Sequence, residues 1–296
     1  MKALFSKTIV ASAVAALSLF ASVGASAQVT TPTYNEFTVN PGTLDRGDGN
    51  SQTGYPYSQF TANKIIGNYN EVITFDNNGG FQVSLYWSAS SFVQEGGIGK
   101  IADSGLDQGS AGAGRDGYGL YALYKAAGTV TTVGGVSNFS FTGPGSLEVY
   151  FDKDRNTTGG IAARPTTGAG DWNLGGDGED ILLATGVALS GDGELDPTTP
   201  SCNRFNFGCG FVASQTTFEL EEAGKQFFVA PNPFYNLSFQ SGQLNRFPIT
   251  PNTTIVIDGS LDVVFERAEV PEPASLGLLG LGLLGLGAAR RRKQVK

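Results

Sequence analysis

Two runs of alternating apolar and polar residues, joined by a turn, constrain the fold more than any other part of this sequence. In the second run, large apolar residues occupy every other position: Phe81, Val83, Leu85 and Trp87. A period of two places such side chains on one face of a β-strand. The segment between the runs, Asp-Asn-Asn-Gly-Gly at 76–80, has the composition of a turn. Residues 69–88 therefore predict an antiparallel β-hairpin with one buried face.

Comparable strand-like segments recur along most of the chain, separated by Gly, Asp, Asn and Pro. We expect strands at 34–39, 64–75, 81–87, 118–125, 136–141, 147–151, 226–229, 235–240 and 254–266. A Gly-Pro-Gly turn at 143–145 is expected to make a second hairpin, and 218–224 the only helical turn. Short strands with frequent turns predict an all-β domain. The expected architecture is an antiparallel β-sandwich, jelly-roll-like, with a split β-barrel as the alternative.

The first 27 residues have the composition of a secretory signal peptide. Lys2 and Lys7 form a basic start, a small and apolar stretch follows, and Ala25 and Ala27 supply a small-residue cleavage pattern. We therefore divide the chain into three parts: a signal peptide at 1–27, a secreted domain at 28–269 and a C-terminal tail at 270–296.

The C-terminal tail has three components in a fixed order. They are the triplet Pro271, Glu272 and Pro273, a Leu/Gly run at 274–289, and a basic cluster that begins with Arg290, Arg291 and Arg292. The prolines keep the triplet extended and open to a processing enzyme. The apolar run of 16 residues is short for a membrane span, and the basic cluster should stay cytoplasmic. We predict a helix inserted transiently in the inner membrane, with an ordinary membrane anchor as the alternative.

This tail resembles the PEP-CTERM sorting signal, which is also catalogued as the ice-binding protein C-terminal domain without implying ice binding. The resemblance implies recognition by an exosortase, a membrane enzyme of exopolysaccharide-producing Gram-negative bacteria that cleaves near the Pro-Glu-Pro triplet. It also implies that the exported chain is released or transferred to the cell surface or the extracellular matrix.

Three further stretches, at 64–75, 228–243 and 257–265, are together similar to the flocculation-associated PEP-CTERM proteins of floc-forming bacteria. This resemblance implies a matrix protein that acts with exopolysaccharide in flocculation and cell aggregation, and it implies no catalytic residues. Two alternatives from other classes remain open: a secreted carbohydrate-binding module and a glycan-active hydrolase of the envelope.

Charge and the lack of histidine limit the function further. The chain has no histidine, so Ser-His-Asp and Cys-His catalytic sites are excluded, and we expect no enzyme activity. Between the two terminal segments, twelve Lys and Arg face 26 Asp and Glu, a net charge of about −14. Such a domain repels nucleic acid and suits divalent cations or neutral polysaccharide.

Three kinds of candidate site residue remain. Cys202 and Cys209 are expected to form a disulfide in the oxidising exported environment, because zinc binding without histidine would need unusual partners. The flexible acidic loops provide candidate calcium ligands at Asp152, Asp154, Asp177 and Asp180, although they do not form an EF-hand, and Asp/Gly turns are the alternative. Trp172 stands alone in a polar loop, so we expect it to be exposed and available to stack on a sugar.

Overall fold

The computed structural model describes residues 34–44, 57–95, 99–106, 117–202 and 208–267. The elements are β1 (Phe37–Val39), η1 (Pro41–Thr43), β2 (Phe60–Ala62), β3 (Lys64–Phe75), β4 (Gly80–Gln94), β5 (Gly99–Lys100), β6 (Gly119–Val133), β7 (Val136–Phe141), β8 (Ser146–Asp152), η2 (Ile161–Ala163), β9 (Ile181–Gly186), β10 (Ala188–Leu195), β11 (Gly210–Thr216), β12 (Glu219–Leu220), α1 (Glu222–Phe227), β13 (Phe228–Ala230), β14 (Asn236–Ser241) and β15 (Thr254–Glu266).

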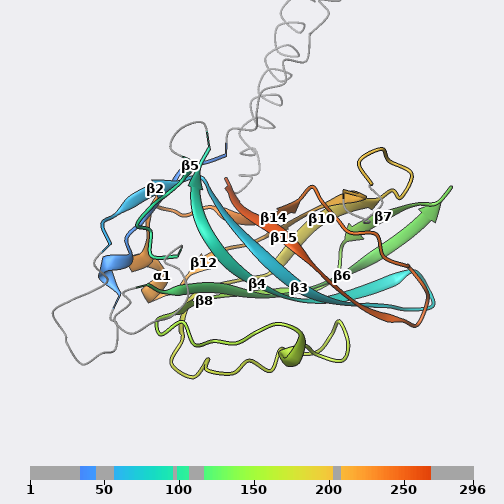
Figure 1. Ribbon diagram of the computed structural model, residues 1–296, viewed down its shortest axis with the longest axis horizontal. Coiled ribbons are helices and arrows are strands. Elements are labelled where there is room, and N and C mark those ends of the chain that lie inside the picture. Colours follow the sequence, from blue (N-terminus) through green and yellow to red (C-terminus); the bar gives the residue numbers. More distant parts are fainter. Residues whose placement is uncertain (1–33, 45–56, 96–98, 107–116, 203–207, 268–296) are drawn as a thin grey trace, which may run out of the picture. The chain divides into compact units, whose positions relative to one another are not determined.

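Eight antiparallel strands close into a barrel (Figure 1). The order of pairing is β6, β7, β10, β11, β14, β15, β3 and β4, and β4 pairs again with β6. In that closing pair Val83 lies opposite Ala126, and Leu85 lies opposite Tyr124. The all-β prediction is therefore confirmed. The strands form a closed barrel in place of the expected jelly-roll sandwich, because β4 and β6, each 15 residues long, pair with each other as well as with their sequence neighbours.

The hairpin predicted from the sequence is confirmed. β3 and β4 pair in register from Phe75 opposite Phe81 to Tyr69 opposite Trp87. The turn is held by Asp76, whose carboxylate accepts hydrogen bonds from the backbone N–H groups of Asn78 and Gly80, both at 2.7 Å. The alternating apolar residues of β4 point into the barrel and are buried.

The Gly-Pro-Gly segment at 143–145 does not turn a hairpin, so that prediction is wrong. β7 and β8 both pair with the same edge of β6, β7 along 128–133 and β8 along 119–125. The turn lies earlier, at Gly134 and Gly135, whose φ angles of 63° and 89° suit a tight hairpin. The chain from 136 to 152 is thus one long strand with a break. On its other edge β7 pairs with β10, which belongs to the barrel. The other edge of β8 pairs with β9, and β9 pairs in turn with β12.

Glycines let large rings fill the barrel. A methyl group on Gly128 would come within 2.7 Å of the Phe81 ring, and one on Gly67 within 2.4 Å of the Trp87 indole. Trp87 also donates a hydrogen bond from its indole N–H to the carbonyl oxygen of Leu261, at 2.8 Å. A small residue beside each ring therefore keeps the interior at the close packing that folded proteins require.

An aromatic cluster packs where β14 and β15 adjoin the small sheet β13-β1-β2. The rings of Phe37 and Phe265 lie 4.7 Å apart, edge to face, and those of Phe228 and Phe234 lie 5.2 Å apart. Each fully buried Phe contributes roughly 1.5 to 3 kcal/mol relative to an exposed one. Helix α1 follows the predicted helical turn at 218–224 and overlaps only its end, because 219–220 pair with β9 as strand β12.

The contact between Gly67 and Trp87 generates a prediction about stability. Substitution Gly67→Ala should lower the free energy of unfolding by about 1 to 3 kcal/mol, because the added methyl group overlaps the buried indole. Gly178→Ala is the matched control, since a methyl group there meets nothing within 4 Å. Urea denaturation of both variants measures the effect, and equal midpoints would contradict the packing described.

Candidate functional site

The predicted processing residues fall outside the residues that the structure describes. These are Ala25 and Ala27 of the signal peptide, together with Pro271, Glu272, Pro273, Arg290, Arg291 and Arg292 of the tail. Within the described ranges, no helix is long and apolar enough to cross a membrane.

The acidic loop after β8 brings two of the four candidate calcium ligands into one hydrogen-bond network. Asp152 is buried and accepts backbone N–H bonds from Asn156 at 3.2 Å and Thr157 at 3.0 Å. The Thr157 hydroxyl donates in turn to Asp180, which also accepts a 2.7 Å bond from the Tyr121 hydroxyl. Burial raises the pKa of Asp180, and the neighbouring Asp152 and Glu179 carboxylates add to the rise, while the two hydroxyl donors oppose it.

The other two candidate ligands are not part of this network. Asp154 and Asp177 are exposed. Among the described residues no group of three or more His, Cys, Asp or Glu side chains is arranged to hold a metal ion. In the structure, the Asp152 and Asp180 carboxylates accept hydrogen bonds that hold the loop in place. Calcium binding by the four residues stays a prediction.

Trp172 is buried, at 8% exposure, so its predicted availability to a sugar is wrong. The loop between β8 and β9 folds back over the outer face of the sheet, and the Trp172 ring packs 5.7 Å from that of Tyr86. These rings begin a row on the outer face of the sheet. Tyr86 packs against Tyr121, and the rings of Tyr121 and Tyr150 stack with their centres 5.1 Å apart. The sequence does carry a signal that this outer face is covered. Apolar residues such as Val72 point outward from the barrel, whereas a strand face open to solvent would be polar.

Glu71 was missed by the sequence reasoning, although the alternation of β3 places it on the same face as Tyr69 and Ile73. Its carboxyl group lines a cavity of about 30 Å³ inside the barrel, and its neighbours across the strands are Leu85 and Ile257. That volume is enough for one or two water molecules. Burial raises the pKa of Glu71 to about 8, so the carboxyl group is protonated at neutral pH.

A larger pocket of about 490 Å³ opens at the surface near the β6–β7 turn. Its lining includes the Arg246 side chain, apolar groups of Leu195, Phe247 and Ile249, and hydroxyl-bearing Thr132 and Ser137. Phe247 also lines the interior cavity. The Phe247 ring therefore stands between the surface pocket and the cavity that contains Glu71.

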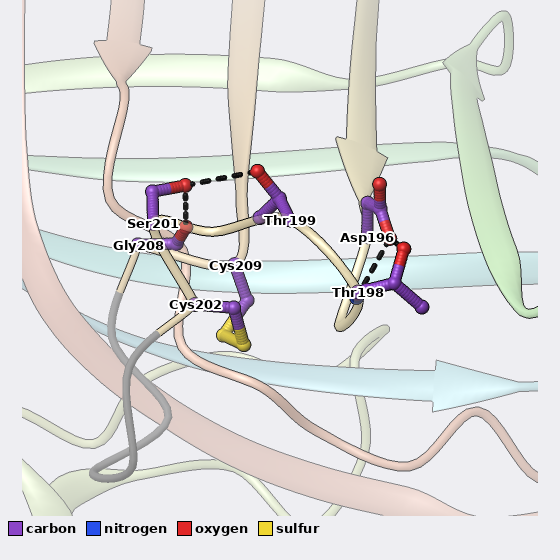
Figure 2. The surroundings of a disulfide bond; sticks show 7 residues. All are labelled: Asp196, Thr198, Thr199, Ser201, Cys202, Gly208 and Cys209. Atoms are coloured by element: carbon purple, nitrogen blue, oxygen red, sulfur yellow. Dashed lines mark hydrogen bonds between the residues drawn. A yellow bond between two sulfur atoms is a disulfide. The ribbon is translucent and has the colours of Figure 1, made fainter.

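The disulfide lies beside this pocket and secures its rim. The sulfur atoms of Cys202 and Cys209 are bonded (Figure 2). The N–H of Cys209 donates to the carbonyl of Leu244 at 2.9 Å, and the carbonyl of Cys209 accepts from Asp196 at 2.7 Å. These two bonds connect the disulfide to the segments that carry Arg246 and Leu195.

Hydroxyl groups hold the chain on the other side of the disulfide. Ser201 donates to the carbonyl oxygen of Gly208 at 2.6 Å, and it pairs with the hydroxyl of Thr199 at 3.2 Å (Figure 2). Hydrogen bonds from the Thr198 side chain and backbone lower the pKa of the Asp196 carboxyl. The segment from 196 to 201 is thus a closely bonded turn that leads from the pocket rim to the disulfide.

Comparison with protein-family models finds the PEP-CTERM protein-sorting motif over residues 269–293. The chain carries a PEP-CTERM sorting signal. This signal implies processing by an exosortase, export and sorting to the cell surface. Comparison with curated proteins and with solved structures gave no match.

The Glu71 carboxyl, which is half-buried and faces the barrel interior, predicts a pH-dependent stability. Its pKa is about 8 in the folded chain and near 4.5 when unfolded, so the unfolded state loses its proton first as pH rises. The folded state should lose up to about 1.4 kcal/mol per pH unit between these values, and Glu71→Gln should remove that loss. Urea denaturation between pH 4.5 and 8 tests this expectation. Parallel stability curves for the two proteins would show that Glu71 does not titrate inside the barrel.

Reduction of the disulfide should weaken the fold without unfolding it. The bond closes a ring with a sequence separation of only 7, for which the loop-entropy model gives about 2 to 3 kcal/mol. Denaturation with and without reductant should show a loss of that size. The double variant Cys202→Ser, Cys209→Ser is the control and should not respond to reductant. Complete unfolding by reductant alone would contradict the small role assigned to this bond.

Proposed function

We propose that this protein is a non-catalytic extracellular-matrix protein that acts with exopolysaccharide in bacterial flocculation and cell aggregation. The observation that carries the proposal is the PEP-CTERM sorting motif, because it directs the chain to the cell surface. In this proposal the apolar tail holds the chain in the inner membrane only until exosortase cleaves it. Mature protein then remains at the surface or in the matrix.

The placement of the family-like stretches supports the same proposal. Residues 64–75 form β3, 228–243 include β13 and β14, and 257–265 belong to β15. In the barrel β14, β15 and β3 are adjacent strands. The resemblance to flocculation-associated proteins thus concerns one continuous part of the barrel wall and the aromatic cluster beside it.

Of the two alternatives, a carbohydrate-binding module has the better support. The surface pocket combines apolar walls with hydroxyl groups and one guanidinium, a lining that suits a sugar. A glycosidase would need two carboxyl groups facing one cleft, roughly 5 to 10 Å apart. Among the described residues that line the surface pocket there is no Asp or Glu, and Glu71 is the only one that lines the interior cavity.

Deletion of the gene should reduce cell aggregation, and the full-length chain should restore it. A chain with Pro271→Ala, Glu272→Ala and Pro273→Ala should be exported but not processed, because the recognition triplet is lost. Floc sedimentation and fractionation between membrane, matrix and medium measure both effects. A chain with Gly178→Ala controls for expression of a variant. Unchanged aggregation after deletion, in a parent strain that displays the protein, would overturn the proposal.

A further inference from the structure

Arg246 brings a positive charge to the surface pocket. Its side chain is exposed at the pocket, and none of the ion pairs between described residues involves its guanidinium. By contrast, Lys64, Lys125 and Lys225 each contact a carboxylate. In a domain with a net charge of about −14, carboxylate partners are abundant, so a guanidinium that meets none of the described carboxylates is available to a ligand at this pocket.

The chemistry of a guanidinium indicates which ligand group it would bind. Arginine presents a planar fork of N–H donors that matches the two oxygens of a carboxylate. Such a pair gives direction as well as charge, and it is stronger when nearby apolar groups exclude water. Leu195, Phe247 and Ile249 supply these groups beside Arg246.

The rest of the lining suits a sugar ring. One face of a sugar is made of C–H groups that pack on aromatic and aliphatic surfaces, whereas its hydroxyl groups need hydrogen-bond partners. The Phe247 ring is held in place by Phe139, with ring centres 6.1 Å apart. Thr132 and Ser137 share a 2.8 Å hydrogen bond at the pocket and can accept or donate to a ligand hydroxyl. The volume of about 490 Å³ lies within the range of small-ligand sites.

We propose that this pocket binds a carboxylated sugar residue, with the Arg246 guanidinium on the carboxylate and Phe247 against the ring. The inference rests on the proposed function and deepens it, because it names acidic polysaccharide as the matrix component that the protein recognises. The acidic surface of the domain repels the remainder of such a chain. Binding therefore needs both a guanidinium that meets no described carboxylate and the apolar and hydroxyl groups beside it, and the lining of this pocket combines them.

Ligand binding at this pocket should also depend on the disulfide. Leu244, two residues before Arg246, bonds to both Cys209 and Gly210 through its backbone. Reduction should therefore loosen the segment that carries Arg246 and Phe247, and weaken binding while the barrel stays folded. This dependence separates the pocket from any charged patch elsewhere on the surface.

Titration calorimetry with short sugars tests the proposal. The probes are trigalacturonic acid and its carboxyl-reduced form, which has the same rings without charge. The wild-type chain should bind only the carboxylated probe, Arg246→Ala should weaken that binding at least tenfold, and Arg246→Lys should restore part of it. Arg164→Ala removes an equal charge from an exposed position outside this pocket and should change nothing. Thermal melting verifies that each variant is folded.

Three results would overturn the proposal. They are equal binding of the two probes, equal behaviour of Arg246→Ala and Arg164→Ala, and no binding of either probe by the folded wild-type chain. A floc assay distinguishes failure of the pocket proposal from failure of the proposed matrix function. If Arg246→Ala supports aggregation as the wild type does, the pocket is not used but the matrix role stands. If deletion leaves aggregation intact while Arg246 still binds uronate, the matrix role fails and the pocket stands.

Discussion

The pairing of β4 with β6 is the contact on which the rest of the domain depends. It joins the last strand of the ring to the first, and it leaves those strands without a free edge along the seam. Closure forces alternate side chains inward, where glycines and rings fit against each other. It also determines what faces the interior, so that the half-buried Glu71 lies among apolar side chains and Phe247 lines the cavity beside it.

Outside the barrel, the polar and aromatic groups that hold the fold together differ from those that are open to a ligand. The outer aromatic row and the acidic loop are occupied with each other, since Trp172 packs on Tyr86 and Asp180 bonds to Tyr121. The pocket around Arg246 is different, because its guanidinium forms no ion pair with a described carboxylate, and hydrogen bonds connect the segments of its rim to the disulfide. The proposed binding site, on a chain with a cell-surface sorting signal, would suit the proposed matrix role.

Local patterns in the sequence predicted local structure well. The alternation and turn at 69–88 predicted the β3–β4 hairpin and its buried face, and the tail revealed the sorting signal. Long-range pairing was beyond such patterns. Nothing near Gly-Pro-Gly at 143–145 indicates that both flanking strands share one edge of β6, and Trp172 looked exposed because the sheet that covers it is distant in sequence. The inward position of Glu71 could have been read from the period of β3, whereas the pocket needs three separate segments to meet.

Amide hydrogen exchange along β6 tests the closure most directly. If β4 and β6 pair as described, the N–H groups of residues 121–129 that face β4 should exchange as slowly as those of β3, because both are internal strands of one barrel. Residues of β6 that face β8 and β7 should be protected as well. Fast exchange of the β4-facing amides, with the others protected, would show that β6 is the edge of an open sheet, and it would contradict the barrel.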